Sequence, residues 1–454
     1  MSDEYPAVAS ATARQRPGRA KPEHEVDVES LSHEGRGIAH INGKVVFVEG
    51  ALAGERVKIQ IVRQQKHFAE AAVLQVLQPS PQRIQPVCPQ AAICGGCSLQ
   101  HWSTEAQIAF KQQVLKEQFQ HFGRIEPEFW LPPLCAETVG YRRKARLGVR
   151  FVQKKNRLLI GFREKQSNFL TDMQECSILD ARIGTIIPQL VQLIASLQVA
   201  AHIPQIEIAA GDSTVALIFR HLLDLGGDDR QALVHFCRSR GWQAWGQRAG
   251  PDSQINLDIL PGDAEALYYD LNKHHLRMWF HPADFTQVHA GINTLMLDSA
   301  LELLDLQAEH QVLDLFCGLG NFSLPMARKV AQVIGVEGSA AMTERASHNA
   351  LKNSLNNTQF HAADLTAEDW QHPWASQVYQ RILLDPPRSG AEAVVRQIKR
   401  WKAERVVYVS CNPATLARDA GILQEQGYRL HSAGVMDMFP HTSHVESIAL
   451  FVRQ

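Results

Sequence analysis

The hydrophobic and polar positions of the chain follow different patterns in successive regions, and the first region predicts short strands. From residue 24 to about residue 82, brief apolar runs alternate with glycine turns, and Asn42-Gly43 between two such runs is a strong hairpin signal. About five strands in roughly 60 residues predict a small β-barrel. A boundary follows, marked by three prolines: Pro79, Pro81 and Pro86.

The regions that follow mix helices with strands. A helix is predicted from about Thr104, with Thr104 and Gln107 as a capping box and Gly123 as its stop. Residues 200–280 alternate β-like runs with one helical stretch and carry no motif with defensible chemistry. From about residue 285 the order strand, turn, helix repeats, which predicts a doubly wound, mostly parallel sheet covered by helices on both faces.

Composition agrees with a cytoplasmic protein of several domains. A length of 454 residues allows about three domains, and 45% hydrophobic with 20% charged residues is ordinary for a globular chain. Residues 1–22 lack the apolar segment of a secretory signal and are interpreted as a solvated tail. No uncharged apolar run reaches the length of about 18 residues that a membrane span needs, so no membrane partner is expected.

The formal net charge of −1 hides a basic segment. Residues 141–165 contain ten Lys and Arg and one Glu, a net charge of +9 that leaves −10 for the rest of the chain. Here Arg146 and Arg150 alternate with four apolar residues, Ala145, Leu147, Val149 and Phe151. This pattern, followed by a KKN turn, predicts a hairpin with one apolar and one cationic face. Such a face is often only solvated, but this charge density favours contact with nucleic-acid phosphates.

The cysteines cluster. Eight cysteines without a secretory signal indicate thiols, metal ligands or catalysis rather than disulfides. Three of them, Cys88, Cys94 and Cys97, fall within ten residues in CPQAAICGGC. Chance explains this spacing poorly, so we predict a shared role.

The informative residues of the last region lie where ligands bind a doubly wound sheet, at the carboxyl ends of its strands. Gly318 and Gly320 follow an apolar strand and precede a helix, a pattern that suits a dinucleotide, S-adenosylmethionine or merely a tight turn. Glu337 ends the next strand, where a carboxylate can bind ribose hydroxyls. Asp364 can hold an adenine amino group or simply cap its own turn, and Asp385 opens the rigid turn DPPR. Together these residues favour a methyltransferase.

Two further residues suit covalent chemistry. Cys411 follows the strand RVVYVS and precedes a helix, whose N-terminus is expected to lower the pKa of the thiol and so favour the nucleophilic thiolate. Most isolated cysteines are small buried hydrophobes, but this one lies where a substrate is expected. Glu446 opens the last strand and can act as a carboxylate base there, although a strand-initial Glu is more often solvated.

Four motifs of the last region, DLFCGLGNFSLP, DPPR, SCNPATLARD and FPHTSHVES, resemble in order and spacing the RNA uracil-C5-methyltransferase family, from Phe285 to the end of the chain. The resemblance implies that Cys411 adds to carbon 6 of uracil and that Glu446 removes the proton from carbon 5 after methylation. It also implies a set of S-adenosylmethionine-binding positions: Gln287, Phe316, Gly318, Gly320, Asn321, Glu337, Asp364 and Asp385.

Two segments point to one branch of that family. LSHEGRGIAHINGKVVFVEGALAGE resembles a TRAM domain, an OB-like RNA-binding module, although a generic adaptor barrel would share its pattern. CPQAAICGGC resembles the iron–sulfur members that methylate 23S rRNA, which implies a structural cluster, expected to be 4Fe-4S, on Cys88, Cys94, Cys97 and Cys176. Structural zinc also suits four thiolates and stays open as an alternative. No role is matched to Cys135, Cys237 or Cys317.

The expected protein is thus an α/β enzyme with a Rossmann-like class I methyltransferase domain, an N-terminal TRAM barrel and a central α+β iron–sulfur domain. The expected boundaries are 1–22 for the tail, 23–82 for the barrel, 83–283 for the central domain and 284–454 for the methyltransferase domain. A monomer acting on 23S rRNA is expected. The alternatives are a tRNA uracil-C5-methyltransferase and a catalytically inactive RNA-binding assembly factor.

Overall fold

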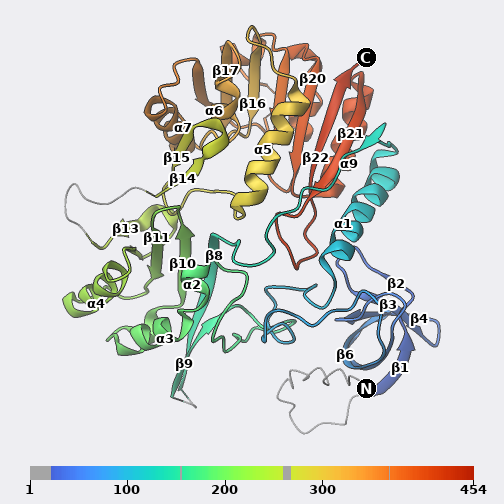
Figure 1. Cartoon of the computed structure of the whole chain (residues 1–454), viewed down its shortest axis with the longest axis vertical. Coiled ribbons are helices and arrows are strands. Elements are labelled where there is room, and N and C mark those ends of the chain that lie inside the picture. Colours follow the sequence, from blue (N-terminus) through green and yellow to red (C-terminus); the bar gives the residue numbers. More distant parts are fainter. Residues whose placement is uncertain (1–21, 154–155, 259–266, 368) are drawn as a thin grey trace.

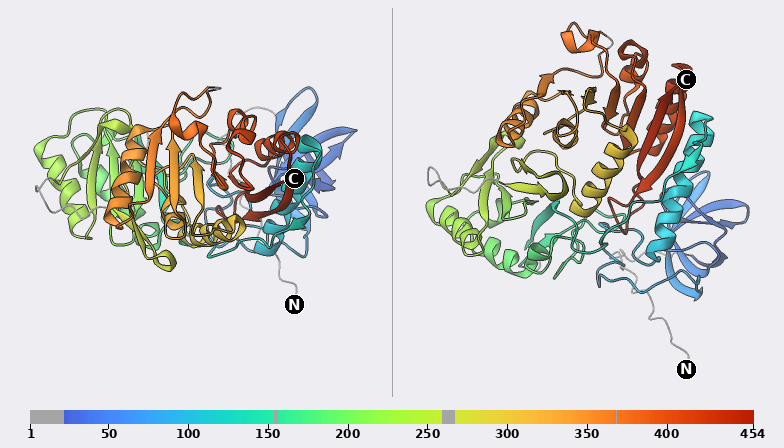
Figure 2. Two further views of the ribbon diagram at one scale, coloured as in Figure 1. Left: turned by 90° about the horizontal axis from the view of Figure 1, so that it is seen from above. Right: turned by 45° about the horizontal axis from the view of Figure 1, so that its top comes forward.

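The computed structural model describes residues 22–454 except 154–155, 259–266 and 368. The predicted solvated tail therefore lies outside the described residues, apart from its last position. Figure 1 shows three β-rich parts, namely a small N-terminal barrel, a mixed middle sheet and a large C-terminal sheet. Seen from above in Figure 2, the barrel and the middle sheet lie at opposite ends, with the large sheet between them. No helix of the described ranges is long and apolar enough to cross a membrane.

The N-terminal strands form a strongly curved sheet with the order β1-β5-β6-β4-β3-β2. The predicted hairpin is confirmed, because Asn42 and Gly43 adopt positive φ angles of 49° and 77° between β3 and β4. One strand more than the predicted five is present among the described residues, since the two-residue β2 was too short to recognise. The strand bounds are β1 Glu23–Asp27, β2 Ser30–Leu31, β3 Gly37–Ile41, β4 Lys44–Glu49, β5 Arg56–Gln64 and β6 Phe68–Gln78.

Buried charge ties the barrel to the segment that follows it. The Arg83 guanidinium donates to both carboxylate oxygens of Glu55, at 2.5 and 2.7 Å, and both side chains are almost fully buried. Lys165 lies 3.7 Å from Glu49 at the end of β4. Since a buried ion pair is costly to break, the barrel is held firmly against the cysteine-bearing segment.

Helix α1 (Thr104–Gln118) continues into a wider turn, Phe119–Gly123, and packs beside β21 and α9 of the large sheet (Figure 1). The predicted stop at Gly123 is confirmed, because the wider turn ends there and Arg124 follows in a left-handed conformation. An added Cβ on Gly123 would lie 2.7 Å from the Ala417 carbonyl oxygen, so the glycine allows the close approach to α9. The predicted capping box is wrong. Ser103 is the N-cap and accepts from the Ala106 amide, so the helix begins one residue earlier than the box requires. Gln107 then points into the protein interior instead of back to the cap.

The middle sheet has the order β13-β12-β11-β10-β8-β9 and is flanked by helices, so the α+β prediction holds for the described part of this region. The predicted cationic hairpin is β8 with β9, and its alternation is confirmed at Arg146 and Arg150, which are exposed between buried apolar residues. Phe151 is exposed, contrary to the alternation. Two residues of the predicted KKN turn, 154–155, lie outside the described residues. The bounds are β8 Lys144–Val152, β9 Arg157–Gly161, β10 Gln205–Ala210, β11 Val215–Arg220, β12 Gln243–Gln247, β13 Gln254–Asn256, α2 Ala181–Gly184, α3 Ile187–Ser196 and α4 Gly227–Arg238.

The large sheet confirms the predicted doubly wound pattern. Its order is β18-β17-β16-β19-β20-β22-β21-β7, and the first five strands of this order are parallel. The strands are β7 Phe129–Trp130, β16 Gln311–Leu315, β17 Gln332–Glu337, β18 Thr358–Ala362, β19 Arg381–Leu384, β20 Arg405–Ser410, β21 Tyr428–Met436 and β22 Glu446–Arg453. A separate hairpin, β14 Tyr268–Leu271 with β15 Leu276–Trp279, precedes it. Its helices are α5 Ala290–Leu304, α6 Ser323–Ala327, α7 Ala340–Lys352, α8 Glu392–Val395 and α9 Pro413–Glu425.

Candidate active site

The topology brings most of the predicted site residues to one edge of the large sheet. Glu337 ends β17, Asp385 follows β19 and Cys411 follows β20, so the parallel strands deliver all three to the carboxyl edge. Strand β22 runs antiparallel to β20, and its register pairs Ser410 with Ser447. Continuing this register by one position sets Glu446, the first residue of β22, beside Cys411, although 34 residues lie between them in the sequence.

The loop after β16 has the strained backbone that its glycines predict. Phe316, Gly318 and Gly320 all have positive φ angles, 65°, 54° and 92°. The φ of Gly320 lies in a region that other residues rarely adopt, and a Cβ there would also lie 2.5 Å from the Leu324 side chain, so glycine is strongly favoured where the loop turns into α6. The Gly318 amide donates to a carboxylate oxygen of Glu337 at 3.2 Å, which links two predicted cofactor positions.

The remaining predicted cofactor positions differ in how they are held. Asn321 is fixed by the Tyr269 hydroxyl at 2.9 Å and by a reciprocal amide pair with Asn293. Asp364 accepts from the amide and hydroxyl of Thr366, and these hydrogen bonds lower the pKa of the exposed carboxyl, as the turn-capping alternative predicts. Gln287 is half-buried. No hydrogen bond connects Gln287 or Asp364 to the other site positions in the described part of the chain.

Acidic side chains make the carboxyl edge electronegative. Burial, followed by the nearby Glu337 carboxylate, raises the pKa of Asp385 to about 7. Burial raises the pKa of Asp314 to about 8, with smaller contributions from Asp385 and Glu337. One oxygen of Asp314 accepts from Ser323, and the other is buried without a recorded partner. Carboxyls whose ionisation is suppressed in this way fit a cationic ligand, such as the sulfonium of S-adenosylmethionine, which would favour their charged forms.

Asp314 was missed by the motif-based reasoning. It lies inside β16, within QVLDL, and is fully buried among apolar strand residues. A single carboxyl in the middle of an otherwise apolar strand is the signal that could have drawn attention to it, because a buried carboxyl needs a specific partner or a function.

The expected lowering of the Cys411 pKa is wrong. Burial is the largest influence and raises the pKa of the thiol to about 11, and the neighbouring Glu446 and Asp385 carboxylates raise it further. Burial also raises the pKa of Glu446 to about 8, with Asp385 as the next contribution. The helix N-terminus cannot outweigh desolvation and two nearby negative charges.

Arg388, the last residue of DPPR, is a second residue that the sequence reasoning did not single out. Its positive charge lowers the pKa of both Cys411 and Glu446, against the larger effects of burial. Its guanidinium lies 3.4 Å from Nδ1 of His444, in the loop that leads to Glu446. The signal was its fixed place directly after the two prolines that follow Asp385.

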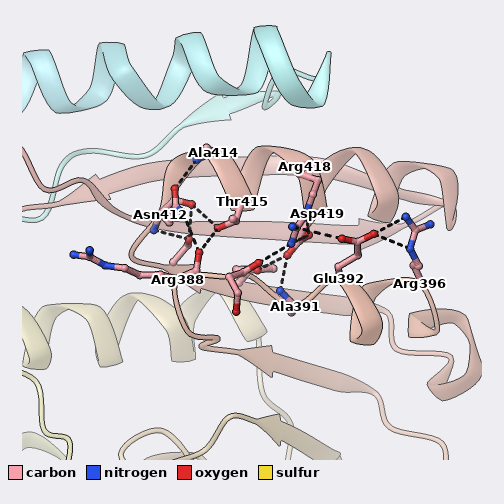
Figure 3. Close-up of polar contacts among 12 residues, drawn as sticks. Arg388, Ala391, Glu392, Arg396, Asn412, Ala414, Thr415, Arg418 and Asp419 are labelled. Carbon is pink, nitrogen blue, oxygen red and sulfur yellow. Dashed lines mark hydrogen bonds and ion pairs between the residues drawn. The ribbon is translucent and has the colours of Figure 1, made fainter. Parts of the chain in front are cut away.

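Hydrogen bonds hold the Arg388 backbone against the start of α9, as Figure 3 shows. The Arg388 carbonyl accepts from the side-chain amide of Asn412 at 2.9 Å and from the Thr415 hydroxyl at 3.3 Å. Three residues on, the Ala391 amide donates to the Asp419 carboxylate at 2.7 Å. The Arg388 side chain reaches away from this network in Figure 3.

The four predicted cluster cysteines converge, although they come from two distant segments. Cys88, Cys94, Cys97 and Cys176 are all buried and line one small cavity. Burial raises the pKa of Cys97 to about 12 and of Cys176 to about 11, and neighbouring cysteines add smaller increases to both. As placed, no three His, Cys, Asp or Glu side chains in the described ranges form a group that could hold a metal ion. The four thiols are thus the right type of ligand for a metal ion or an iron–sulfur cluster, but their present positions do not form a complete metal site.

Strand order and site together define the class of the protein. The large sheet has five parallel strands, and the strand order reverses beside β16, where the glycine loop follows. The antiparallel strands β22 and β21 extend the sheet on one side. This is the architecture of a class I methyltransferase. The chain matches the tRNA (Uracil-5-)-methyltransferase family over residues 103–454 and the TRAM domain over residues 23–74. It therefore belongs to the RNA uracil-C5-methyltransferases and carries an N-terminal TRAM domain, as the motifs predict.

Individual relatives agree with this assignment. The chain is 49% identical over 440 residues to "23S rRNA (uracil(1939)-C(5))-methyltransferase RlmD" of Alcanivorax borkumensis, covering 97% of this chain and 98% of the relative. It is 52% identical over 430 residues to the protein of the same name from Hahella chejuensis, covering 94% and 96%. The fold is similar to that of Pyrococcus abyssi tRNA (uracil-54, C5)-methyltransferase in complex with S-adenosyl-L-homocysteine, with a TM-score of 0.73 and 23% identity over 94% of this chain and 100% of that one.

Proposed function

We propose that this enzyme methylates carbon 5 of a specific uracil in 23S rRNA, using S-adenosylmethionine and a covalent adduct to Cys411. The observation that carries the proposal is the register that puts Cys411 and Glu446 side by side at the carboxyl edge. The relatives named for 23S rRNA, which this chain matches over almost its full length, support the choice of substrate.

Cys411 acts as the nucleophile. Carbon 5 of uracil is too poor a nucleophile to take a methyl group unaided, so the Cys411 thiolate first adds to carbon 6 and generates an enolate. S-adenosylmethionine, when bound, supplies the methyl group that carbon 5 then takes. Arg388 favours the thiolate, because its charge opposes the burial that raises the Cys411 pKa.

Glu446 acts as the general base of the release step. After methylation, carbon 5 still carries its proton, and the Cys411–carbon 6 bond breaks only when that proton is removed. The strand register, which sets Glu446 beside the nucleophile, supports Glu446 as the group that accepts it. The raised pKa of Glu446, about 8, makes it a stronger base than an ordinary carboxylate.

Release of the methylated RNA should depend on pH. Because the Glu446 pKa is raised to about 8, the carboxyl is mostly protonated at lower pH and cannot accept the carbon 5 proton. We expect the release rate of a preformed adduct to rise about tenfold per pH unit below pH 8 and to level off above it. Quenched-flow measurement on an adduct formed at pH 6 and shifted to higher pH checks this. A release rate that stays flat between pH 6 and pH 8 would contradict it.

The carboxyl edge supplies the cofactor site in this proposal. Glu337 binds the ribose, Asp364 the adenine amino group, and the loop of Phe316, Gly318 and Gly320 brings backbone close to the ligand. Further contacts are assigned to Asn321, Gln287 and Asp385. The support is the loop geometry, the contact between Gly318 and Glu337, and the acidic surroundings that suit a sulfonium cation.

We assign the four converging cysteines, Cys88, Cys94, Cys97 and Cys176, to an iron–sulfur cluster, expected to be 4Fe-4S. Four thiolates leave no iron open for chemistry, so the cluster's role is structural. Its ligands tie the segment after the barrel to the segment before α2. Structural zinc is the competing occupant, and iron and sulfide analysis of the purified protein distinguishes the two.

RNA binding is assigned to the TRAM barrel and to the cationic face of the β8–β9 hairpin. A stacked base cannot reach Cys411, so the target uracil must be unstacked or flipped. Domain boundaries at 22/23, 82/83 and 283/284, a monomeric state and a cytoplasmic location complete the proposal.

Replacing Arg150 with alanine should weaken RNA binding without preventing methylation at saturating RNA. Arg150 is exposed on β8, so its loss removes a phosphate contact but leaves the core intact. We expect the slope of log affinity against log salt to fall by about 0.7–0.9. The matched control is Arg238→Ala on α4, a similarly exposed arginine paired with Asp258 outside the hairpin. Equal effects of the two variants would contradict the assignment.

The substrate is tested by supplying labelled S-adenosylmethionine with unmodified 23S rRNA or unmodified tRNA, and then analysing the digested nucleosides. The proposal predicts 5-methyluridine in 23S rRNA. Label in tRNA alone would favour the tRNA enzyme, and no label in either RNA would favour an inactive assembly factor. The intact pair of Cys411 and Glu446 favours an active enzyme, because an RNA-binding factor needs neither.

A further inference from the structure

The loop that leads to Glu446, residues 437–445, is held by groups distant in the sequence. We call these residues the base loop. Lys111 of α1 donates to the Asp437 carboxylate at 2.6 Å and to the Phe439 carbonyl at 3.1 Å. Both charged side chains are almost completely buried, with 0% and 2% exposure. One end of the base loop is thereby anchored to α1.

The middle of the base loop is bound to the residues that follow the clustered cysteines. The amides of Ser98 and Leu99, next to Cys97, both donate to the His441 carbonyl, at 3.0 and 2.9 Å. The His441 amide in turn donates to the Gln107 side-chain oxygen at 2.9 Å. We call residues 94–99 the cysteine segment. Its last two residues thus contact the base loop directly.

Gln107 joins the two loops through a fully used amide. Its oxygen accepts from the base loop, and its nitrogen donates to the Leu99 carbonyl at 3.1 Å and to the Trp102 carbonyl at 2.7 Å. The side chain is 1% exposed. A buried amide whose oxygen and nitrogen are both paired favours a single geometry, whereas its loss leaves its buried partners unpaired.

His441 has a backbone that needs this support. Its φ is 66°, a left-handed conformation that residues other than glycine rarely adopt, and the residue is buried. Such a conformation persists only where the surrounding structure determines it strongly. Three hydrogen bonds hold the His441 backbone here: its carbonyl accepts from the Ser98 and Leu99 amides, and its amide donates to Gln107.

From these contacts we propose that Gln107 is a positioning residue that couples the cysteine segment to the base loop and so sets the place of Glu446. The inference rests on the proposed function for the roles of Glu446 and of the cysteines. It gives the cysteine segment a task in catalysis besides its structural role: an ordered cysteine segment holds His441, and His441 lies five residues before the base.

The coupling is tested by hydrogen exchange on the full-length protein without substrate. We compare wild type with Gln107→Met, which keeps the size of the side chain but removes its hydrogen bonds. Gln113→Met is the matched control, since Gln113 lies on the same helix but is exposed. Amides of the base loop should exchange about tenfold faster in Gln107→Met and unchanged in the control. Equal exchange in wild type and Gln107→Met would overturn the proposal.

The consequence for Glu446 is tested by the covalent adduct. In Gln107→Met, release of methylated RNA should slow about tenfold, so adduct accumulates, while affinity for S-adenosylmethionine changes less than twofold. Faster exchange without adduct accumulation would overturn the link to Glu446. If Gln107→Met does not fold, the same measurements are made on Gln107→Glu. This variant keeps the size of the side chain and the acceptor for the His441 amide, but it loses the donors to Leu99 and Trp102. Unchanged exchange in that variant would likewise overturn the coupling.

Failure of the proposed function is distinguishable from failure of this inference. The exchange measurement needs neither RNA nor methylation, so it reports on the contact between the two loops even in an inactive protein. Conversely, the Gln107→Met variant could methylate 23S rRNA normally and show unchanged hydrogen exchange. That result would leave the proposed function standing and overturn the coupling.

Discussion

Replacing Cys411 with alanine is expected to abolish methylation, lowering turnover by about 10⁴-fold or more. Without the thiolate, carbon 5 of uracil never becomes nucleophilic, so neither the methyl transfer nor the adduct forms. Binding of S-adenosylmethionine should be retained, since Cys411 is not among the residues assigned to the cofactor. Methyl transfer in a single-turnover assay and cofactor affinity by calorimetry measure the two properties separately.

The control for this variant is Cys135→Ala, which removes an exposed cysteine that has no assigned role. It should leave turnover within about twofold of wild type. Near-normal methylation by Cys411→Ala would exclude a covalent mechanism at this position, whatever the remaining activity of the control.

Replacing Glu446 with glutamine should trap the enzyme on its RNA. The amide keeps the size of the side chain but cannot accept the carbon 5 proton, so the reaction stops after methyl transfer with Cys411 still bonded to carbon 6. We expect release to slow by about 10²–10⁴-fold, with close to one methylated RNA bound per enzyme. Denaturing electrophoresis with labelled methyl groups detects this adduct.

The matched control is Glu425→Gln, an exposed carboxyl at the end of α9. It should form no lasting adduct. Normal multiple turnover by Glu446→Gln would rule out Glu446 as the base, and a loss of methyl transfer itself would place its role before the release step.

Much of the site could be predicted because it follows from the order of strands. Asp385 and Cys411 each follow an apolar strand, and parallel strands deliver their carboxyl ends to one edge. Glu446 begins β22, which is antiparallel to β20, so the start of β22 lies at that same edge. The glycine loop was recognisable for a similar local reason, since Gly318 and Gly320 stand directly between an apolar strand and a helix. Local pattern and sheet topology were sufficient for these residues.

The rest depends on contacts between distant segments, which one sequence does not reveal. Gln107 fitted a local capping box, but its partners are the carbonyls before α1 and an amide of the base loop. The Cys411 pKa was judged from one helix N-terminus, whereas burial and the carboxylates of Glu446 and Asp385 determine it. Arg388 acquires its influence only because its loop is held against α9.

The central claim is that methyl transfer occurs at carbon 5 of a uracil in 23S rRNA and ends with loss of the proton from that carbon. The most direct test uses unmodified 23S rRNA labelled with tritium at carbon 5 of its uracils, together with methyl-labelled S-adenosylmethionine. The account predicts release of one tritium to water for each methyl group transferred by the wild-type enzyme. Methyl incorporation without tritium release would place the methyl group on another atom and contradict the account.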